Sequence, residues 1–91
     1  MISFREKVFR IVRRIPKGKT MSYKQVAFLI DSSKAWRAVG NVLNTNKNLK
    51  IPCHRVIKSD GKIGGYRYGT KKKTALLKKE GVVVKKRRVV R

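Results

Sequence analysis

Residues 22–45 have the sequence SYKQVAFLIDSSKAWRAVGNVLNT, which predicts two short helices joined by a polar turn. Ser22 and Gln25 have the spacing of a capping box, in which each side chain accepts a hydrogen bond from the other residue's backbone amide at a helix start. The apolar residues expected in this first helix are Val26, Ala27, Leu29 and Ile30. The second helix is expected over about residues 34–45, with three apolar residues on one face: Trp36, Val39 and Leu43. Two such helices indicate a helix-turn-helix.

The flanking segments predict two further helices and a small hairpin. Ser3 and Glu6 form another capping box, which opens a helix that Pro16 and Gly18 end. Asp60-Gly61, between the short apolar runs 56–58 and 62–63, indicates a hairpin turn. Thr70 is expected to cap a last helix that stops at Gly81. The predicted fold class is mainly α with a small β-hairpin, a winged-helix-like helix-turn-helix domain.

The domain prediction places one domain at residues 1–81 and a basic C-terminal tail at residues 82–91. The tail alternates valines with lysines and arginines. Two behaviours are open for it: it pairs as a strand, or it stays loose until DNA is bound.

The charge of the chain indicates a polyanionic partner. It has 26 Lys and Arg against 4 Asp and Glu, a formal net charge of +22 over 91 residues. Nucleic acid is the expected partner, ahead of an anionic membrane or an acidic protein, and this composition also suits a small ribosomal protein. With no apolar run near the ~20 residues that cross a bilayer and no secretory signal, we expect an intracellular monomer of the cytoplasm or nucleoid, without membrane contact.

The segment Pro52-Cys53-His54-Arg55 holds the only cysteine and the only histidine of the chain. A thiol reacts as thiolate, and neighbouring imidazole or cationic groups favour that form. One cysteine with one histidine cannot complete a four-ligand zinc site, so no metal is expected. A lone cysteine is more often a small core residue than a nucleophile. The segment alone therefore leaves a reactive thiol and a buried filler both open.

Six motifs together resemble the C-terminal, DNA-binding and active-site domain of the O6-alkylguanine-DNA alkyltransferases. They follow the order of that family, near its spacing, over roughly residues 4–81. The motifs are Ser22-Tyr23-x-x-Val26-Ala27, Arg37-Ala38-Val39-Gly40, Asn46, Pro52-Cys53-His54-Arg55-Val56, Gly64-Gly65-Tyr66 and Leu76-Leu77-x-x-Glu80-Gly81.

The resemblance implies a suicide repair protein, which moves an alkyl group from O6 of a flipped guanine in DNA to a cysteine, irreversibly and without a cofactor. Carried over, Cys53 is the acceptor, His54 is its base through a bound water, and Glu80 orients His54. Asn46 braces the turn before the active-site loop. The resemblance places three residues around the substrate base, of which the first donates a hydrogen bond to it: Tyr23, Val56 and Tyr66.

The resemblance also implies contacts with double-stranded DNA that contains O6-alkylguanine. Arg37 enters the base stack where the flipped guanine had been. Ala38 and Gly40 are small enough for the helix to approach the floor of a minor groove only ~6 Å wide, although a helix–helix contact is the alternative for Gly40. The other DNA contacts that the resemblance implies are Ser22, Lys24, Ser32 and Ser59.

Some positions depart from the family pattern. Lys47 stands where proline is common, and Arg67 where a small or hydroxyl residue is frequent. We expect no counterpart of the family's separate N-terminal domain, and the similarly short alkyltransferase-like proteins replace the cysteine. Cys53, His54 and Glu80 together favour a minimal, competent alkyltransferase. The alternatives are a lesion-recognition module without alkyl transfer and a basic structural nucleic-acid binder in which Cys53 is idle.

Overall fold

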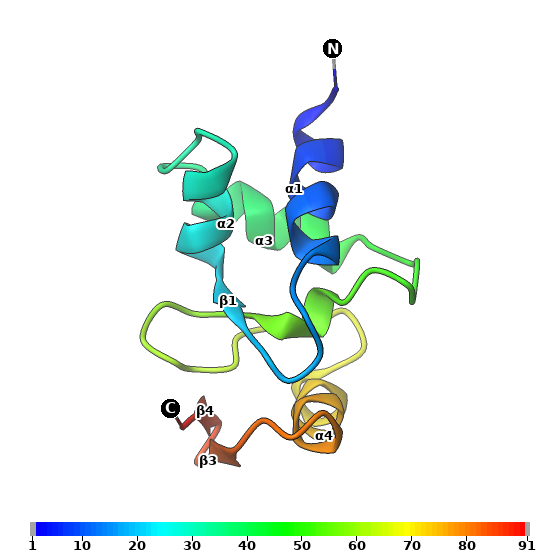
Figure 1. Ribbon diagram of the computed structural model, residues 1–91, viewed down its shortest axis with the longest axis vertical. Helices are drawn as coiled ribbons and strands as arrows, with labels where there is room; N and C mark the ends of the chain where they lie inside the picture. The colour runs from blue at the N-terminus through cyan, green and yellow to red at the C-terminus, as the bar shows by residue number, and fades with distance from the viewer. Residues whose placement is uncertain (1, 91) are drawn as a thin grey trace.

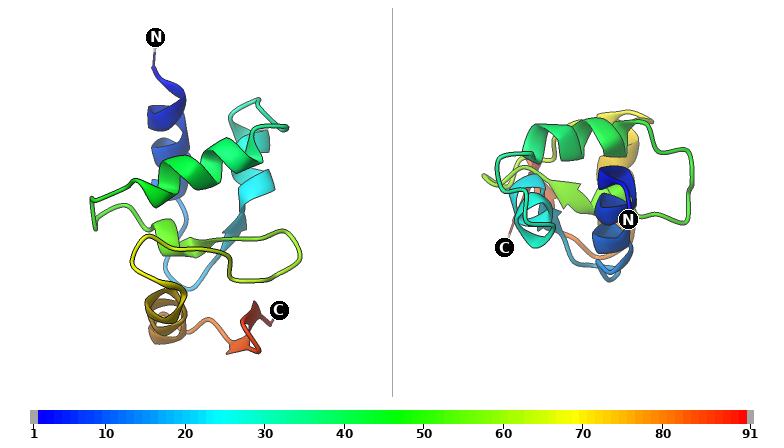
Figure 2. Two further views of the ribbon diagram at one scale, coloured as in Figure 1. Left: turned by 180° about the vertical axis from the view of Figure 1, so that it is seen from behind. Right: turned by 90° about the horizontal axis from the view of Figure 1, so that it is seen from above.

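The computed structural model describes residues 2–90, in which four α-helices and four two-residue strands build a small domain (Figure 1). The elements are α1 (Phe4–Arg13), β1 (Met21–Ser22), α2 (Tyr23–Leu29), α3 (Trp36–Asn44), a 3₁₀ turn η1 (Cys53–Arg55), β2 (Val56–Ile57), α4 (Thr70–Lys79), β3 (Val84–Lys85) and β4 (Arg88–Val89). The helices α1, α2 and α3 gather at one end of the molecule and α4 lies at the other, with the η1–β2 segment between them (Figures 1 and 2). The mainly helical fold with a helix-turn-helix is confirmed.

Local capping explains where the first helices begin. The Ser3 Oγ accepts a hydrogen bond from the Glu6 amide at 3.1 Å. At α2 the capping box is complete, because Ser22 Oγ accepts from the Gln25 amide at 3.0 Å and Gln25 Oε1 accepts from the Ser22 amide at 2.8 Å. For α4 the predicted helix and its stop at Gly81 agree with the structure, but the predicted cap was wrong: Gly69, at φ 96°, is the N-cap and Thr70 is the first helical residue. A glycine adopts that left-handed conformation without the strain that Cβ would impose on a threonine.

One apolar cluster joins α1, α2 and α3 to the η1–β2 segment. Its buried members are Val8, Val12, Ile15, Val26, Ala27, Val39, Leu43, Ile51, Cys53 and Val56. Two residues predicted to face this core do not, since Leu29 is 52% exposed and Trp36 is 37% exposed. The Trp36 ring instead lies beneath cations, with the Arg37 guanidinium 5.0 Å and the Lys24 ammonium 5.8 Å from its centroid.

The strand β2 pairs in parallel with β1, Met21 opposite Val56 and Ser22 opposite Ile57. The predicted hairpin of 56–58 with 62–63 is wrong. The turn at Asp60-Gly61 forms, with the Lys58 amide donating to the Lys62 carbonyl at 2.9 Å and the Gly61 amide to the Lys58 carbonyl at 3.0 Å. Beyond the turn, however, residues 62–63 bond to Arg87 and Arg88 instead of to β2. The parallel pair ties the start of α2 to the segment that carries Cys53.

The C-terminal segment pairs as a strand, which was one of its two predicted behaviours. β3 and β4 form an antiparallel hairpin, with Val84 opposite Val89, and Lys62 bridges Arg88 in antiparallel fashion. Val82 packs with Ile57 and Leu77 in a second buried cluster. Among residues 2–90, no helix is long and apolar enough to cross a membrane.

Candidate functional site

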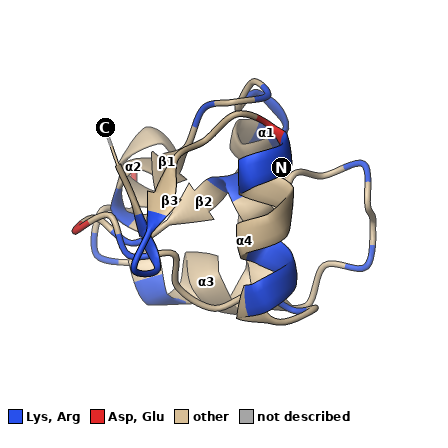
Figure 3. Ribbon diagram, turned by 90° about the horizontal axis from the view of Figure 1, so that it is seen from below, with Lys and Arg blue, Asp and Glu red and all other residues tan. Residues whose placement is uncertain are grey.

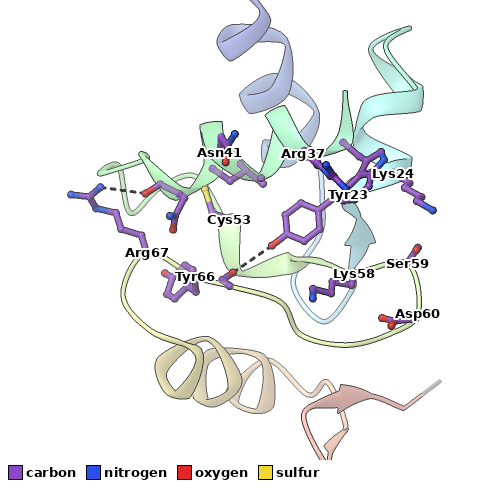
Figure 4. Close-up of a pocket in the computed structure, with 15 residues that line it drawn as sticks. Tyr23, Lys24, Arg37, Asn41, Cys53, Lys58, Ser59, Asp60, Tyr66 and Arg67 are labelled. Carbon is purple, nitrogen blue, oxygen red and sulfur yellow. Dashed lines mark hydrogen bonds between the residues drawn. The ribbon is translucent and has the colours of Figure 1, made fainter. Parts of the chain in front are cut away.

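A cavity of about 490 Å³ opens between α3 and the loop that follows β2 (Figure 4). This volume lies in the range of small-molecule sites. Its lining residues are Tyr23, Lys24, Trp36, Arg37, Gly40, Asn41, Leu43, Asn44, Cys53, Lys58, Ser59, Asp60, Gly65, Tyr66 and Arg67. Seven predicted site residues thus meet at one cavity: Tyr23, Lys24, Arg37, Gly40, Cys53, Ser59 and Tyr66.

Cys53 begins the turn η1 and is 7% exposed. Its Sγ accepts a hydrogen bond from Asn46 Nδ2 at 3.0 Å. The same amide group donates to the Asn48 carbonyl at 3.0 Å, and Asn46 Oδ1 accepts from the Asn48 amide at 2.9 Å. Asn46 therefore bonds both to the loop that follows it and to the thiol. The resemblance implied that it braces this turn. Burial raises the pKa of Cys53, although the Asn46 hydrogen bond and the charge of Lys73 oppose this.

Behind the thiol, His54 contacts a carboxylate that an arginine also holds. His54 Nε2 lies 3.0 Å from Glu80 Oε1. Arg55 donates to the same carboxylate twice, from Nε to Oε1 at 3.0 Å and from Nη2 to Oε2 at 2.6 Å. A fork of this kind fixes the carboxylate in plane and position. Arg55 also donates to the Ile15 carbonyl at 2.8 Å, which anchors the group to the end of α1.

The charge states of this pair follow from their surroundings. The Arg55 hydrogen bonds, with that of His54, lower the pKa of Glu80 in spite of burial, so the carboxylate is ionised at neutral pH. Burial lowers the pKa of His54, and Glu80 only partly restores it. The neutral imidazole donates its Nε2 proton to Glu80, which leaves the Nδ1 lone pair free to accept a proton.

Sequence reasoning missed Lys73, which is fully buried. Its Nζ donates to the Val56 carbonyl at 2.6 Å, the Gly65 carbonyl at 3.1 Å and the Tyr23 hydroxyl at 3.4 Å. Burial lowers its pKa to about 7. The run of lysines at 71–73 hid it, but its spacing of four from Leu77 places it on the buried face of α4, and that was the available signal.

Tyr23 reaches from the start of α2 toward the loop that carries Gly65 (Figure 4). Burial, and the Cys53 thiol beside it, raise the pKa of its phenol, so the hydroxyl is a neutral donor. Two glycines leave room for the ring. A Cβ on Gly64, at φ 75°, would lie 3.2 Å from the Tyr23 hydroxyl, and one on Gly40 would lie 3.8 Å from the ring.

Several predicted residues lie outside the cavity. Val56 is fully buried, and its carbonyl accepts from Lys73. Ser22 is 4% exposed, and its Oγ caps α2. The others that do not line it are Ser32, Ala38, Asn46, His54 and Glu80. His54, Asn46 and Glu80 instead stand behind Cys53, whereas DNA contacts of Ser22, Ser32 and Ala38 stay predictions.

A helix-turn-helix with basic residues at the mouth of a cavity is typical of a DNA-binding protein, and the cysteine with an imidazole–carboxylate pair behind it is a candidate nucleophile. The particular family follows from comparison with known sequences. The chain belongs to the 6-O-methylguanine DNA methyltransferase family, whose DNA-binding domain matches residues 3–82.

The relatives include methyltransferases and proteins crystallised with DNA. A methylated-DNA–protein-cysteine methyltransferase of Saccharolobus islandicus is 54% identical over 82 residues, which are 89% of this chain and 52% of the relative. Mycobacterium tuberculosis OGT in complex with DNA superposes with a TM-score of 0.84 at 39% identity, over 89% of this chain and 50% of the other. Schizosaccharomyces pombe Atl1, in complex with damaged DNA containing O6-carboxymethylguanine, gives a TM-score of 0.84 at 30% identity. This match covers 93% of this chain and 83% of Atl1. The chain spans at most about half the length of the curated methyltransferases it matches.

Proposed function

We propose that this protein repairs DNA by transferring the alkyl group from O6 of an alkylated guanine to Cys53, after the base has been flipped out of the duplex. The observation that carries the proposal is the position of Cys53, whose thiol lines a cavity of about 490 Å³ while the His54–Glu80 pair stands behind it. The family and the relatives named for cysteine methylation support the same reaction. DNA that contains O6-alkylguanine is the proposed partner.

The first step is removal of the thiol proton. Because burial raises the pKa of Cys53, the thiol is protonated at neutral pH and needs a base. The Nδ1 atom of His54 takes the proton through a water molecule. The Glu80 carboxylate, fixed by Arg55, then stabilises the imidazolium.

The second step is displacement at the alkyl carbon. The Cys53 Sγ–carbon bond forms while the carbon–O6 bond breaks, and guanine leaves with a negative charge. The Tyr23 hydroxyl, which in this structure donates to the Gly65 carbonyl at 3.4 Å, turns its proton to the departing base, and Lys73 donates to the hydroxyl oxygen at 3.4 Å. The product is a thioether on Cys53, which no group near the site can cleave, so each molecule acts once.

Arg37 is proposed to occupy the space that the flipped base leaves. Extruding a base costs a few kcal/mol, and a planar cation that stacks offsets part of that cost. Arg37 stands at the mouth of the cavity (Figure 4) and already stacks on Trp36 at 5.0 Å.

The substitution Arg37→Ala is expected to slow repair of duplex substrate by about tenfold or more, because a loss of at least 1.4 kcal/mol of stabilisation of the opened duplex corresponds to a factor of ten. Reaction with free O6-benzylguanine should change little, since no duplex is opened. Single-turnover rates on the two substrates measure this difference. Equal losses on both would contradict the intercalating role.

The decisive experiment is intact mass analysis after incubation with an oligonucleotide duplex that contains O6-methylguanine. We expect a stoichiometric gain of one methylene mass on the protein. The Cys53→Ala variant is the matched control, because alanine fits the same buried position, and it should gain nothing.

A second candidate is a lesion-recognition module that binds alkylguanine without transfer. Two observations favour it: the likeness to Atl1 covers 83% of that chain, and the pKa of Cys53 is raised rather than lowered. An unmodified mass together with tight, lesion-selective binding would support this module. Equal affinity for damaged and undamaged duplex would indicate a basic structural binder.

A further inference from the structure

The turn between β3 and β4 contains two residues in an unfavourable backbone conformation. Val84–Lys85 pairs with Arg88–Val89, so the turn consists of Lys86 and Arg87 alone. Both have positive φ, 49° and 62°. Two-residue hairpins with positive φ at both positions strongly favour Asn-Gly or Asp-Gly, because other side chains strain there at roughly 1–2 kcal/mol each. The chain places two long cations at a point where the backbone favours small residues.

The two turn residues and the strand residues on either side of them are all positively charged. Lys85, Lys86, Arg87 and Arg88 are consecutive and all exposed. Among residues 2–90 none of the four forms an ion pair. Figure 3 shows this basic turn projecting from the hairpin. Because like charges repel, such a group is stabilised by an external polyanion.

The hairpin is attached to the wall of the cavity. The Ile63 amide donates to the Arg87 carbonyl at 3.0 Å, and the Val89 amide donates to the Gly61 carbonyl at 2.9 Å. Gly61 directly follows Lys58, Ser59 and Asp60, which line the cavity. The hairpin therefore extends the wall that faces the helix-turn-helix. In Figures 1 and 2 it lies on the same side of the molecule as α2 and this loop.

We propose that the β3–β4 hairpin is a second phosphate-binding surface, which holds the backbone of duplex DNA beside the site of base extrusion. The loop that the hairpin extends, residues 58–60, lines the cavity together with Lys24 and Arg37 of the helix-turn-helix. The helix-turn-helix and the hairpin therefore lie beside the same cavity and can contact phosphates of one duplex. The strained turn places guanidinium and ammonium groups at the tip. This proposal goes beyond the proposed alkyl transfer. It depends on the proposed function only in taking duplex DNA as the partner.

The test replaces the tip with the residues that its backbone favours. Lys86→Asn/Arg87→Gly removes two charges and suits the positive φ at both positions. Its midpoint of thermal unfolding should be equal to or above that of the wild type. Binding to an undamaged duplex, followed by fluorescence anisotropy across a salt series, should lose about 0.9 of log–log slope per phosphate contact, about 1.8 in all. Damaged duplex should lose the same factor, because phosphate contacts carry no sequence information.

The matched control is Lys71→Gln/Lys78→Gln, which removes two exposed charges from α4. It should keep a slope closer to that of the wild type. A second variant, Lys85→Gln/Arg88→Gln, removes the strand charges and leaves the turn intact, and it should lower the slope in the same way. A wild-type slope in both hairpin variants, or losses no larger than the control, would overturn the proposal. Binding to undamaged duplex needs no alkyl transfer, so a failure of the proposed reaction would leave this result readable.

Discussion

Cys53 lies in a strongly basic chain, with a formal net charge of +22, yet its thiol is not activated by that charge. Burial removes the thiolate from water, and this outweighs the nearby Lys73 and Arg5, so the pKa of Cys53 is raised. A buried, protonated thiol is also protected from adventitious oxidation, which requires exposed thiolate. In the proposed reaction the thiol must therefore lose its proton when the substrate is bound, and His54 with Glu80 is the pair that we propose for this step.

The substitution Glu80→Gln is expected to slow alkyl transfer by about tenfold at neutral pH. A hydrogen bond to a charged partner contributes about 1.5 kcal/mol or more, which corresponds to that factor. Glu80 raises the pKa of His54 against the effect of burial, so its neutral replacement lowers that pKa further and shifts the acid limb of the rate profile to lower pH. Single-turnover rates between about pH 4 and 8 measure both effects.

Glu6→Gln is the matched control, because Glu6 is exposed on α1 away from the site. An acid limb that does not move in Glu80→Gln would contradict the role of Glu80.

The pH dependence of stability gives an independent check on Glu80. Because the pKa of Glu80 is lowered from 4.5 in the fold, the wild type loses the stability contributed by this carboxylate as pH falls below that value. The glutamine variant should lack that loss.

Lys73 gives a second pH dependence of stability, in the same direction as that of Glu80 but at higher pH. Its pKa is about 7 in the fold and 10.5 ordinarily, so between these values the unfolded chain binds more protons than the folded one. Stability should therefore rise with pH over this window, by at most about 4 kcal/mol between pH 7 and 10 at 1.36 kcal/mol per pKa unit. Lys73→Met should lack this rise, whereas Lys72→Met, at an exposed position, should keep it. Urea unfolding at the two pH values measures the difference, and the same rise in all three proteins would refute the assignment.

At the scale of elements, the pairing of β1 with β2 ties the start of α2 to the segment that carries the thiol. Ser22 caps α2 and pairs with Ile57, while its neighbour Tyr23 enters the cavity. Cys53 lies three residues before β2, in the turn η1 that leads into that strand. The positions of Tyr23 and Cys53 are thus coupled through two residue pairs, and a loosened start of α2 should alter the site.

Ser22→Ala is expected to cost about 1 kcal/mol of stability through the lost cap, and to slow alkyl transfer as well. Ser3→Ala is the control, since it removes an equivalent cap from α1, which contributes no residue to the cavity. It should cost about as much stability without slowing the reaction. Thermal unfolding and single-turnover rates separate the two effects. If both variants slow transfer equally, the coupling through β1 and β2 is wrong.

The elements that could be predicted from sequence are those with local causes. Capping boxes act over three residues: the one at Ser22 is complete in the structure, and at Ser3 only the bond from the Glu6 amide to the Ser3 side chain is present. The hairpin at Asp60 was mispredicted because strand pairing is decided at a distance: β2 pairs with β1, more than thirty residues earlier, and residues 62–63 pair with the C-terminal segment at Arg87 and Arg88. Lys73 and Arg55 were missed for the same reason, because their partners become neighbours only in the fold.

At the scale of the whole molecule, the charge is spread over nearly every exposed element, as Figure 3 shows for α3, α4 and the hairpin. The carboxylates are few, and the most buried of them, Glu80, is already held by Arg55 and His54. Most of the exposed cations form no ion pair within residues 2–90, and those that face the duplex can contact phosphates. This distribution suits a protein that must search undamaged DNA, since sequence-independent contacts permit sliding along the duplex.

Affinity for undamaged duplex is therefore expected to fall steeply with salt. A protein that contacts six to ten phosphates loses roughly 10³–10⁵ in affinity between about 50 and 200 mM salt, and the net charge of +22 supports contacts of that number. The ratio of affinities for lesion and undamaged duplex should stay nearly constant over the same range, because the groups that recognise the base lie in the cavity rather than on the charged surface. Anisotropy titrations on the two duplexes test this. A flat affinity across salt would mean that the charges do not contact phosphates, and a ratio that falls with salt would mean that recognition of the base is itself electrostatic.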